Sequence, residues 1–174
     1  MQPVLVLGIG NILLRDEGVG VRVVDALGDY VLPDDVEVAD GGTAGADLVE
    51  LLADRRKVIV VDAVEAGAAP GTILRLTPAD LLPEPGELIS LHQLGLAESL
   101  HMTAQLQCSP QEVIIIAVQP ATISPGLELS AAVEAQLPAV VRAVIAELGS
   151  GHDGSARSPG GPAIVPRRTA TAGQ

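Results

Sequence analysis

The feature that most constrains the fold is a set of short, uninterrupted apolar runs, each followed by a glycine turn or a polar residue. Val4–Leu7 opens into Gly8-Ile9-Gly10-Asn11, and Val58–Val61 ends at Asp62. A third run spans Val113–Val118. Runs this short and apolar are typical of strands buried on both faces, which occur in parallel sheets covered by helices. The sequence therefore predicts an α/β fold, a three-layer, mostly parallel twisted sheet of about five strands with helices on both faces.

The segments between these runs supply the remaining elements. Val36–Asp40 alternates like a further strand that stops at a glycine-rich turn, and Thr72–Leu76 is expected to be a short edge strand because its connection is too short for a helical crossover. Helices are expected at about 16–28 with Asp16 as N-cap, 46–53, 92–105 and 130–148, the last kinked at Pro138. Residues 78–86 are expected to form an irregular loop.

Length and composition favour one domain over residues 1–149 and a disordered tail over 150–174, where Gly, Pro, Ser, Thr, Ala and Arg dominate. A net charge of −12 argues against a nucleic-acid or anionic-membrane partner. No apolar stretch approaches a membrane span, and the start resembles no export signal. The one cysteine, Cys108, fits a reducing compartment, so we expect a cytoplasmic protein.

The glycine turn after the first run suggests nucleotide binding, but only weakly. Gly8-Ile9-Gly10 begins like a dinucleotide fingerprint, yet Leu13 stands where the third glycine is required. The acidic pair Asp16 and Glu17 follows where a phosphate would be repelled. Nucleotide binding is therefore a minor alternative, and we expect no organic cofactor.

Three polar residues at expected strand ends or helix starts could form a metal site. Glu17, Asp62 and His92 offer two carboxylates and an imidazole, a set that suits Zn, Ni or Mn with coordination positions left open. Each also has a purely structural interpretation: Glu17 as a charge favoured by a helix dipole, Asp62 as a turn residue and His92 as an N-terminal helix residue. The spacing alone leaves both interpretations open.

Asp40 is a candidate general base, and equally a candidate for an Asx turn before Gly41 and Gly42. The sequence contains no Gly-x-Ser-x-Gly elbow, and Cys108 has no histidine paired with it by local pattern. His101 and His152 have no evident role. A covalent nucleophile is therefore not indicated.

Four motifs in register closely resemble the hydrogenase maturation endopeptidases over about residues 3–148. They are Gly8-Ile9-Gly10-Asn11-Ile12-Leu13-Leu14-Arg15-Asp16-Glu17-Gly18-Val19-Gly20, Asp40-Gly41-Gly42-Thr43-Ala44-Gly45, Val61-Asp62-Ala63 and His92-Gln93-Leu94-Gly95-Leu96. Glu17 and the His-Gln-Leu-Gly run resemble the branch that serves uptake-type nickel-iron hydrogenases. Ala117 departs from the resemblance, since relatives often have glycine there, and this bears on packing more than on chemistry.

The resemblance implies an endopeptidase that removes a C-terminal extension from the hydrogenase large subunit precursor after nickel insertion. It implies that Glu17, Asp62 and His92 contact nickel supplied by the substrate, that Asp40 takes part in proteolysis, and that Gly41, Gly42 and Thr43 bind substrate. The expected partner is thus the nickel-loaded precursor. Two alternatives remain: a metallopeptidase with its own zinc at the same three residues, and a non-catalytic nickel-binding chaperone.

Overall fold

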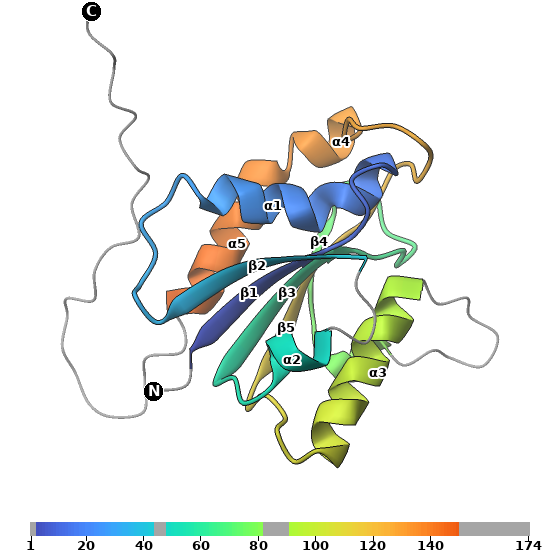
Figure 1. Cartoon of the computed structure of the whole chain (residues 1–174). Coiled ribbons are helices and arrows are strands. Elements are labelled where there is room, and N and C mark those ends of the chain that lie inside the picture. The colour runs from blue at the N-terminus through green and yellow to red at the C-terminus, as the bar shows by residue number, and fades with distance from the viewer. Residues whose placement is uncertain (1–2, 44–47, 82–90, 150–174) are drawn as a thin grey trace, which may run out of the picture.

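The computed structural model describes residues 3–43, 48–81 and 91–149, without the side chains of 91–93. Its centre is a sheet in the order β2-β1-β3-β5-β4 (Figure 1). The strands are β1 (Val4–Ile9), β2 (Val36–Gly42), β3 (Lys57–Ala63), β4 (Ile73–Leu76) and β5 (Val113–Val118). Neighbours among β1, β2, β3 and β5 pair in parallel, whereas β4 pairs antiparallel with β5 at the edge. The predicted sheet and its edge strand are confirmed.

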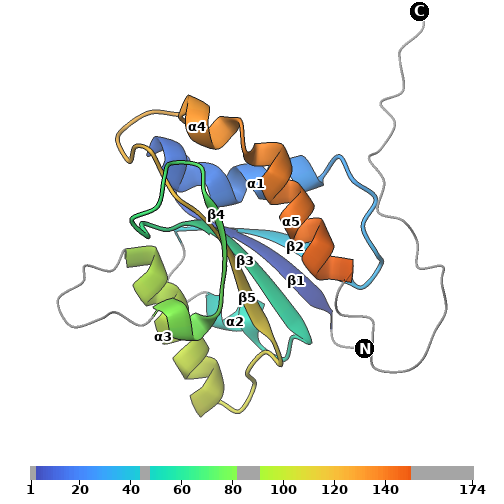
Figure 2. The ribbon, with the colours of Figure 1, turned by 180° about the vertical axis from the view of Figure 1, so that it is seen from behind.

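Helices cover both faces of the sheet (Figures 1 and 2). One face carries α1 (Val19–Leu27), α4 (Ala131–Glu134) and α5 (Leu137–Gly149). The other carries α2 (Leu48–Leu52) and α3 (Leu91–Gln105). Two short 3₁₀ helices, η1 (Arg15–Gly18) and η2 (Pro78–Leu81), lie in the connections. The three-layer expectation is confirmed, and within the described residues no helix has the length and apolar character needed to cross a bilayer.

Aliphatic side chains fill two cores, one on each face of the sheet. Along β3, Ile59 and Val61 point into the core beneath α1 and α5, while Val58 and Val60 point into the core beneath α2 and α3. All four are fully buried. The strands are apolar on both faces because both faces are covered by helices.

The first predicted helix is wrong at its start. The chain forms η1 first, and α1 begins only at Val19 with Gly18 as its N-cap. Asp16 therefore does not cap α1. Its carboxylate instead accepts hydrogen bonds from a segment more than a hundred residues away in the chain, a role that no local helix signal distinguishes from capping.

The last predicted helix is divided in two. Ala135 and Gln136 separate α4 from α5, and Pro138 stands in the first turn of α5, where its missing N–H leaves no helical hydrogen bond unmade. The predicted kink at Pro138 is thus a break. Ser130 caps α4 by accepting a bond of 3.4 Å from the N–H of Val133.

Other boundaries differ slightly from prediction. β2 continues two residues further than expected, to Gly42, and α2 begins at Leu48. The predicted start of that helix at 46–47, most of the predicted loop at 78–86 and the predicted disordered tail at 150–174 lie outside the described residues.

Candidate active site at the carboxyl rim of the sheet

The carboxyl ends of β1, β2, β3 and β5 meet at one rim of the sheet (Figure 1). Ligands of open parallel sheets bind beyond this rim. Asp62 lies in β3 beside Ala117 of β5, and Glu17 follows β1 in η1. The rim is therefore where the predicted site residues should be sought.

Two glycines let η1 and α1 lie directly against the sheet. Gly10 has φ +137°, and a Cβ built there would lie 1.8 Å from the carbonyl oxygen of Glu17. A Cβ on Gly20 would lie 2.2 Å from the carbonyl oxygen of Val61. Only glycine permits these approaches. Close packing of backbone thus accounts for the glycine turn that suggested a nucleotide site.

Glu17 and Asp62 are brought together at the rim. Asp62 is 3% exposed, and its Oδ1 has no hydrogen-bond partner among the described residues. Burial raises the pKa of Asp62 well above its usual value, and the negative charge of Glu17 raises it further, although the N–H of Ala63 acts in the opposite direction. A buried carboxyl oxygen without a partner among the described residues, with a second carboxylate near enough to act on it, favours either a proton on Asp62 or a cation bound beside it.

The backbone of His92 lies on the helix that flanks this rim from the other face. α3 leads through a short connection into β5, so α3 runs opposite to β5 and its N-terminal end lies at the rim (Figure 2). The imidazole of His92 is outside the described side chains. Among the side chains that are described, no three His, Cys, Asp or Glu residues form a metal-binding group. The third predicted ligand therefore remains a prediction.

Asp40 lies at the end of β2, exposed to solvent. Its Oδ1 accepts a hydrogen bond of 2.7 Å from the N–H of Gly42, which is the Asx turn considered above. Asp40 is in register with Gly8 of β1, and Gly8 with Val61 of β3. Two strand spacings thus put the backbone of Asp40 about 10 Å from β3. The turn orders the carboxylate without testing its catalytic role.

The predicted substrate-binding residues follow Asp40 directly. Gly41 is buried, and a Cβ there would lie 2.9 Å from Cδ1 of Leu7, while Gly42 has φ +47°. Thr43 is exposed. The two glycines thus have structural reasons to be glycine, and substrate binding by all three stays a prediction.

Asp16, expected from the sequence only to cap a helix, has a structural role at the rim that the sequence did not predict. Fully buried, it accepts at Oδ2 from the N–H groups of Ala121 (2.8 Å) and Thr122 (3.0 Å). Ser130 adds its N–H to Oδ1 (2.7 Å) and its hydroxyl to Oδ2 (2.8 Å). Burial by itself would raise the pKa of Asp16, but these hydrogen bonds outweigh it and lower the pKa. Asp16 therefore holds the loop after β5 against η1, beside Glu17.

Backbone hydrogen bonds also hold the loop after β5 against η1 and the residues just before it. The N–H of Arg15 donates to Gly126 (3.0 Å), and the N–H of Gly126 donates to Leu13 (2.9 Å). No local pattern in the sequence links these segments.

Gln119, buried just after β5, is a structural residue that the sequence analysis did not identify. Its Oε1 accepts from the N–H groups of Ala66 (2.9 Å) and Ala68 (3.2 Å), and its Nε2 donates to Glu65 (2.8 Å). It thereby fixes the turn between β3 and β4. A polar residue directly after an apolar strand was the available signal, but it does not reveal the partners.

The mostly parallel sheet with helices on both faces defines an α/β protein whose candidate site is the carboxyl rim, and comparisons with known proteins identify its family. The sequence model of the family described as hydrogenase maturation protease matches residues 21–147. This chain belongs to the hydrogenase maturation protease family and is accordingly a peptidase. The resemblance found in the sequence is confirmed.

The relatives agree with this assignment. The Hydrogenase 2 maturation protease of Escherichia coli is 41% identical over 147 residues, covering 83% of this chain and 90% of the relative. HupM, a hydrogenase expression/formation protein of Azotobacter chroococcum, is 41% identical over 153 residues, covering 84% and 73%.

Solved structures share the fold. The hydrogenase maturating endopeptidase HYBD from E. coli superposes with a TM-score of 0.80 at 39% identity, covering 87% of this chain and 94% of that one. The [NiFe] hydrogenase maturation protease HycI from Thermococcus kodakarensis gives a TM-score of 0.69 at 26% identity, covering 84% and 92%.

Proposed function

We propose that this peptidase removes the C-terminal extension of a nickel-iron hydrogenase large subunit precursor after nickel has been inserted. In this proposal Glu17, Asp62 and His92 recognise the nickel that the substrate carries. The observation that supports it most directly is the buried carboxyl of Asp62, with Oδ1 lacking a hydrogen-bond partner among the described residues and with Glu17 nearby. The [NiFe] hydrogenase specificity of the T. kodakarensis relative agrees with this choice of substrate.

The paired carboxyls explain why loaded precursor would be preferred. Without a cation, burial and the charge of Glu17 favour the protonated form of Asp62. A divalent ion carried by the substrate compensates the negative charge and accepts the carboxylate as a ligand. Nickel-free precursor offers no such compensation, so it should dock more weakly.

Docking through nickel would position the scissile bond for attack by water. Holding reactants in place supplies several kcal/mol, up to about 10, of barrier reduction. Asp40 is our candidate for the base that activates water, because the Asx bond to Gly42 orients one carboxylate oxygen and leaves the second to accept a proton. Polarisation of the scissile carbonyl by the nickel is the alternative route. Gly41, Gly42 and Thr43 would contact the substrate chain beside Asp40.

The test is cleavage of nickel-loaded and nickel-free precursor, followed by mass spectrometry of the products. We expect the wild-type protein to trim only loaded precursor and His92→Ala to trim neither. His101→Ala is the matched control, because His101 is an exposed histidine of α3 about two and a half helical turns further along. Trimming at the normal rate by His92→Ala would remove His92 from the site.

Two alternatives are separated by simple measurements. Stoichiometric, tightly held zinc in the purified protein would favour a metallopeptidase with its own metal. A non-catalytic chaperone would leave the C-terminal extension attached. We also propose the cytoplasm as the compartment, since Cys108 is a free thiol and reducing conditions preserve it.

A further inference from the structure

The outer side of β2 offers unpaired backbone at the edge of the sheet. No strand among the described residues pairs there, since β2 is the first strand in the sheet order. The carbonyl oxygen of Asp35 accepts a hydrogen bond of 2.8 Å from the N–H of Val4 in β1. Backbone groups of alternate residues face the same neighbour in a parallel ladder, so those of Glu37 and Ala39 also face β1. The N–H and C=O groups of Val38 and Asp40 therefore point away from the sheet.

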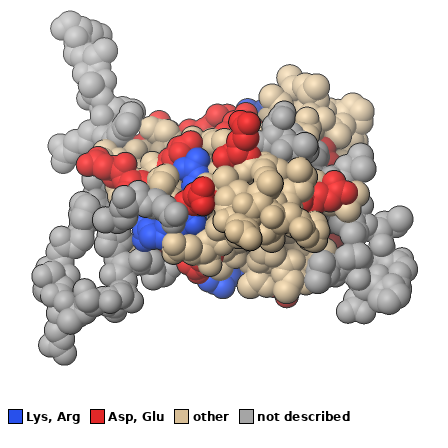
Figure 3. All heavy atoms as spheres, turned by 60° about the horizontal axis from the view of Figure 1, so that its bottom comes forward, with Lys and Arg blue, Asp and Glu red and all other residues tan. Residues whose placement is uncertain are grey.

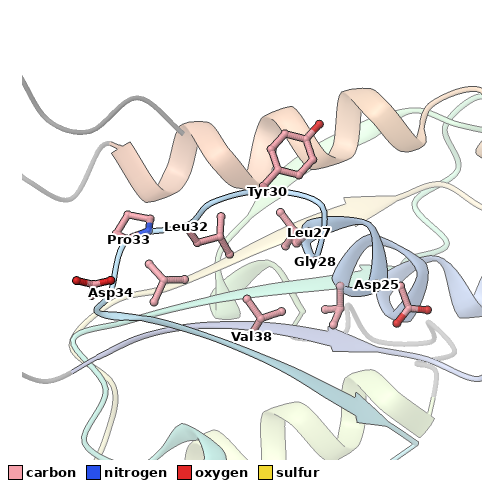
Figure 4. Close-up of a pocket in the computed structure, with 10 residues that line it drawn as sticks. Asp25, Leu27, Gly28, Tyr30, Leu32, Pro33, Asp34 and Val38 are labelled. Carbon is pink, nitrogen blue, oxygen red and sulfur yellow. The ribbon is translucent and has the colours of Figure 1, made fainter. Parts of the chain in front are cut away.

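A groove lies beside this edge, between β2, the end of α1 and the loop that joins them (Figure 4). It encloses a cavity of about 520 Å³ with Leu27, Leu32 and Val38 among its apolar lining. Figure 4 shows Asp25 and Asp34 at opposite ends of the groove. An added strand would point alternate side chains toward it, because side chains alternate between the two faces of a sheet.

We propose that the C-terminal extension of the precursor binds as an additional strand on the outer edge of β2. One large apolar side chain of the extension enters the groove, and basic residues next to it face Asp25 and Asp34. This inference rests on the proposed function and names how its substrate chain is held. Strand addition combines main-chain hydrogen bonds for affinity with side-chain pockets for specificity.

Three observations favour this occupant. An endopeptidase must hold an extended chain near its catalytic group, and β2 leads directly to Asp40 at the rim. β4, the other edge strand, runs in the opposite direction and ends away from the rim. The carboxylates at the groove and the net charge of −12 favour a basic segment, and Asp and Glu also prevail over Lys and Arg on the face of the molecule in Figure 3. An added strand would lie about 4.8 Å outside β2, within reach of the Asp40 side chain.

Proline at position 38 tests the backbone pairing. Val38→Pro removes an outward N–H without removing a bond to β1, whereas Val38→Ala keeps that N–H and loses side-chain packing. Ile73→Pro is the matched edge control, because the bond from Gln119 to Thr72 implies that the backbone of Ile73 also faces outward, on β4. In the full chain acting on nickel-loaded precursor, we expect Val38→Pro to lower kcat/KM about tenfold and Ile73→Pro to stay within about threefold of wild type. Val38→Ala, which trims the groove lining but keeps the outward N–H, should lower kcat/KM less than Val38→Pro does.

Charge reversal tests the groove. Asp34→Lys should raise KM for precursor while leaving kcat little changed, and Asp25→Lys should do the same. Asp29→Lys, an exposed carboxylate of the same connection that does not line the groove, should match wild type. Equal effects of all three substitutions would contradict binding of the extension at the groove and would indicate only a long-range effect of the changed net charge.

Hydrogen exchange on the wild-type protein keeps the test independent of any variant's folding. With a synthetic peptide of the precursor's C-terminal segment, the amides of Val38 and Asp40 should exchange more slowly, whereas those of Glu37 and Ala39, already bonded to β1, should not change.

The failure of each proposal is recognisable. If wild-type protein does not cleave loaded precursor, the proposed function fails. If it cleaves and Val38→Pro cleaves equally well, or Ile73→Pro loses as much, strand addition on β2 is overturned. A wild-type dimer in sedimentation that Val38→Pro converts to monomer would assign the edge to a second copy of this chain and also overturn it.

Discussion

Replacing Asp16 tests whether a buried carboxylate organises the rim. Asp16→Ala removes the acceptor of four hydrogen bonds, from Ala121, Thr122 and twice from Ser130. A hydrogen bond to a charged group contributes about 1.5–3 kcal/mol. The four do not add, because the loop can relax and water can enter. Each neutral donor left unsatisfied in a buried place costs about 1–3 kcal/mol, so with partial relaxation we expect a total loss of about 3–5 kcal/mol.

The effect should be visible in thermal unfolding. One kcal/mol shifts the melting temperature of a domain of this size by about 2–4 °C, so Asp16→Ala should melt about 6–20 °C lower. Asp16→Asn keeps the shape but turns one acceptor oxygen into a donor, and should lose about 2–3 kcal/mol. Asp29→Asn, a change at an exposed carboxylate, should remain within about 0.5 kcal/mol of wild type.

The pH dependence gives a second readout. The lowered pKa of Asp16 means that its contribution is present above the unfolded-state value of about 3.9 and is lost as the pH falls through the folded-state value. The stability difference between wild type and Asp16→Asn should therefore be constant at neutral pH and narrow below about pH 4. Equal melting temperatures for wild type and Asp16→Ala at pH 7 would refute the reasoning.

Three further outcomes are expected. Asp62→Asn should abolish precursor cleavage and raise the melting temperature at neutral pH. The pKa of Asp62 is raised in the folded protein, so its carboxyl destabilises the fold once the pH rises above the pKa of the unfolded state. Mass spectrometry measures the cleavage and calorimetry the melting temperature, and a lower melting temperature would contradict the second expectation. Gly20→Ala should lower the free energy of unfolding by about 3 kcal/mol or more, because the new Cβ would clash with the carbonyl oxygen of Val61. Gly149→Ala is the control in denaturant titrations, because a Cβ there meets nothing within 4 Å. A chain ending at Gly149 should process precursor at the wild-type rate, and a slower rate would give the remaining residues a role.

The sheet was predictable because its signal is local. Val58–Val61 and Val113–Val118 are apolar at every position, and only a strand covered on both faces needs such a run. Helix starts were less predictable. Asp16 is a residue type favoured at N-caps and precedes an apolar periodic segment, yet its hydrogen-bond donors lie beyond Val118, and nothing near it in the sequence indicates them.

The candidate site was also predictable from the sequence only in part. Carboxylates at strand ends follow from the pattern, so Glu17 and Asp62 could be placed at one rim before any coordinates. Their mutual proximity depends on Gly10 and Gly20, which set how closely η1 and α1 approach the sheet. The roles of Gly41 and Gly42 were ambiguous for a related reason: glycine serves both tight packing and access for a substrate chain, and the residue type does not distinguish them.

The junction at Asp16 also bears on how the enzyme is made. It joins residues separated by 105 to 114 positions, so the loop after β5 must be synthesised before it can pack against Asp16, beside Glu17. Contacts this distant in sequence form late in folding because a long chain segment must be ordered first. A partly synthesised chain thus lacks a finished rim, and proteolytic competence arrives only with the complete domain.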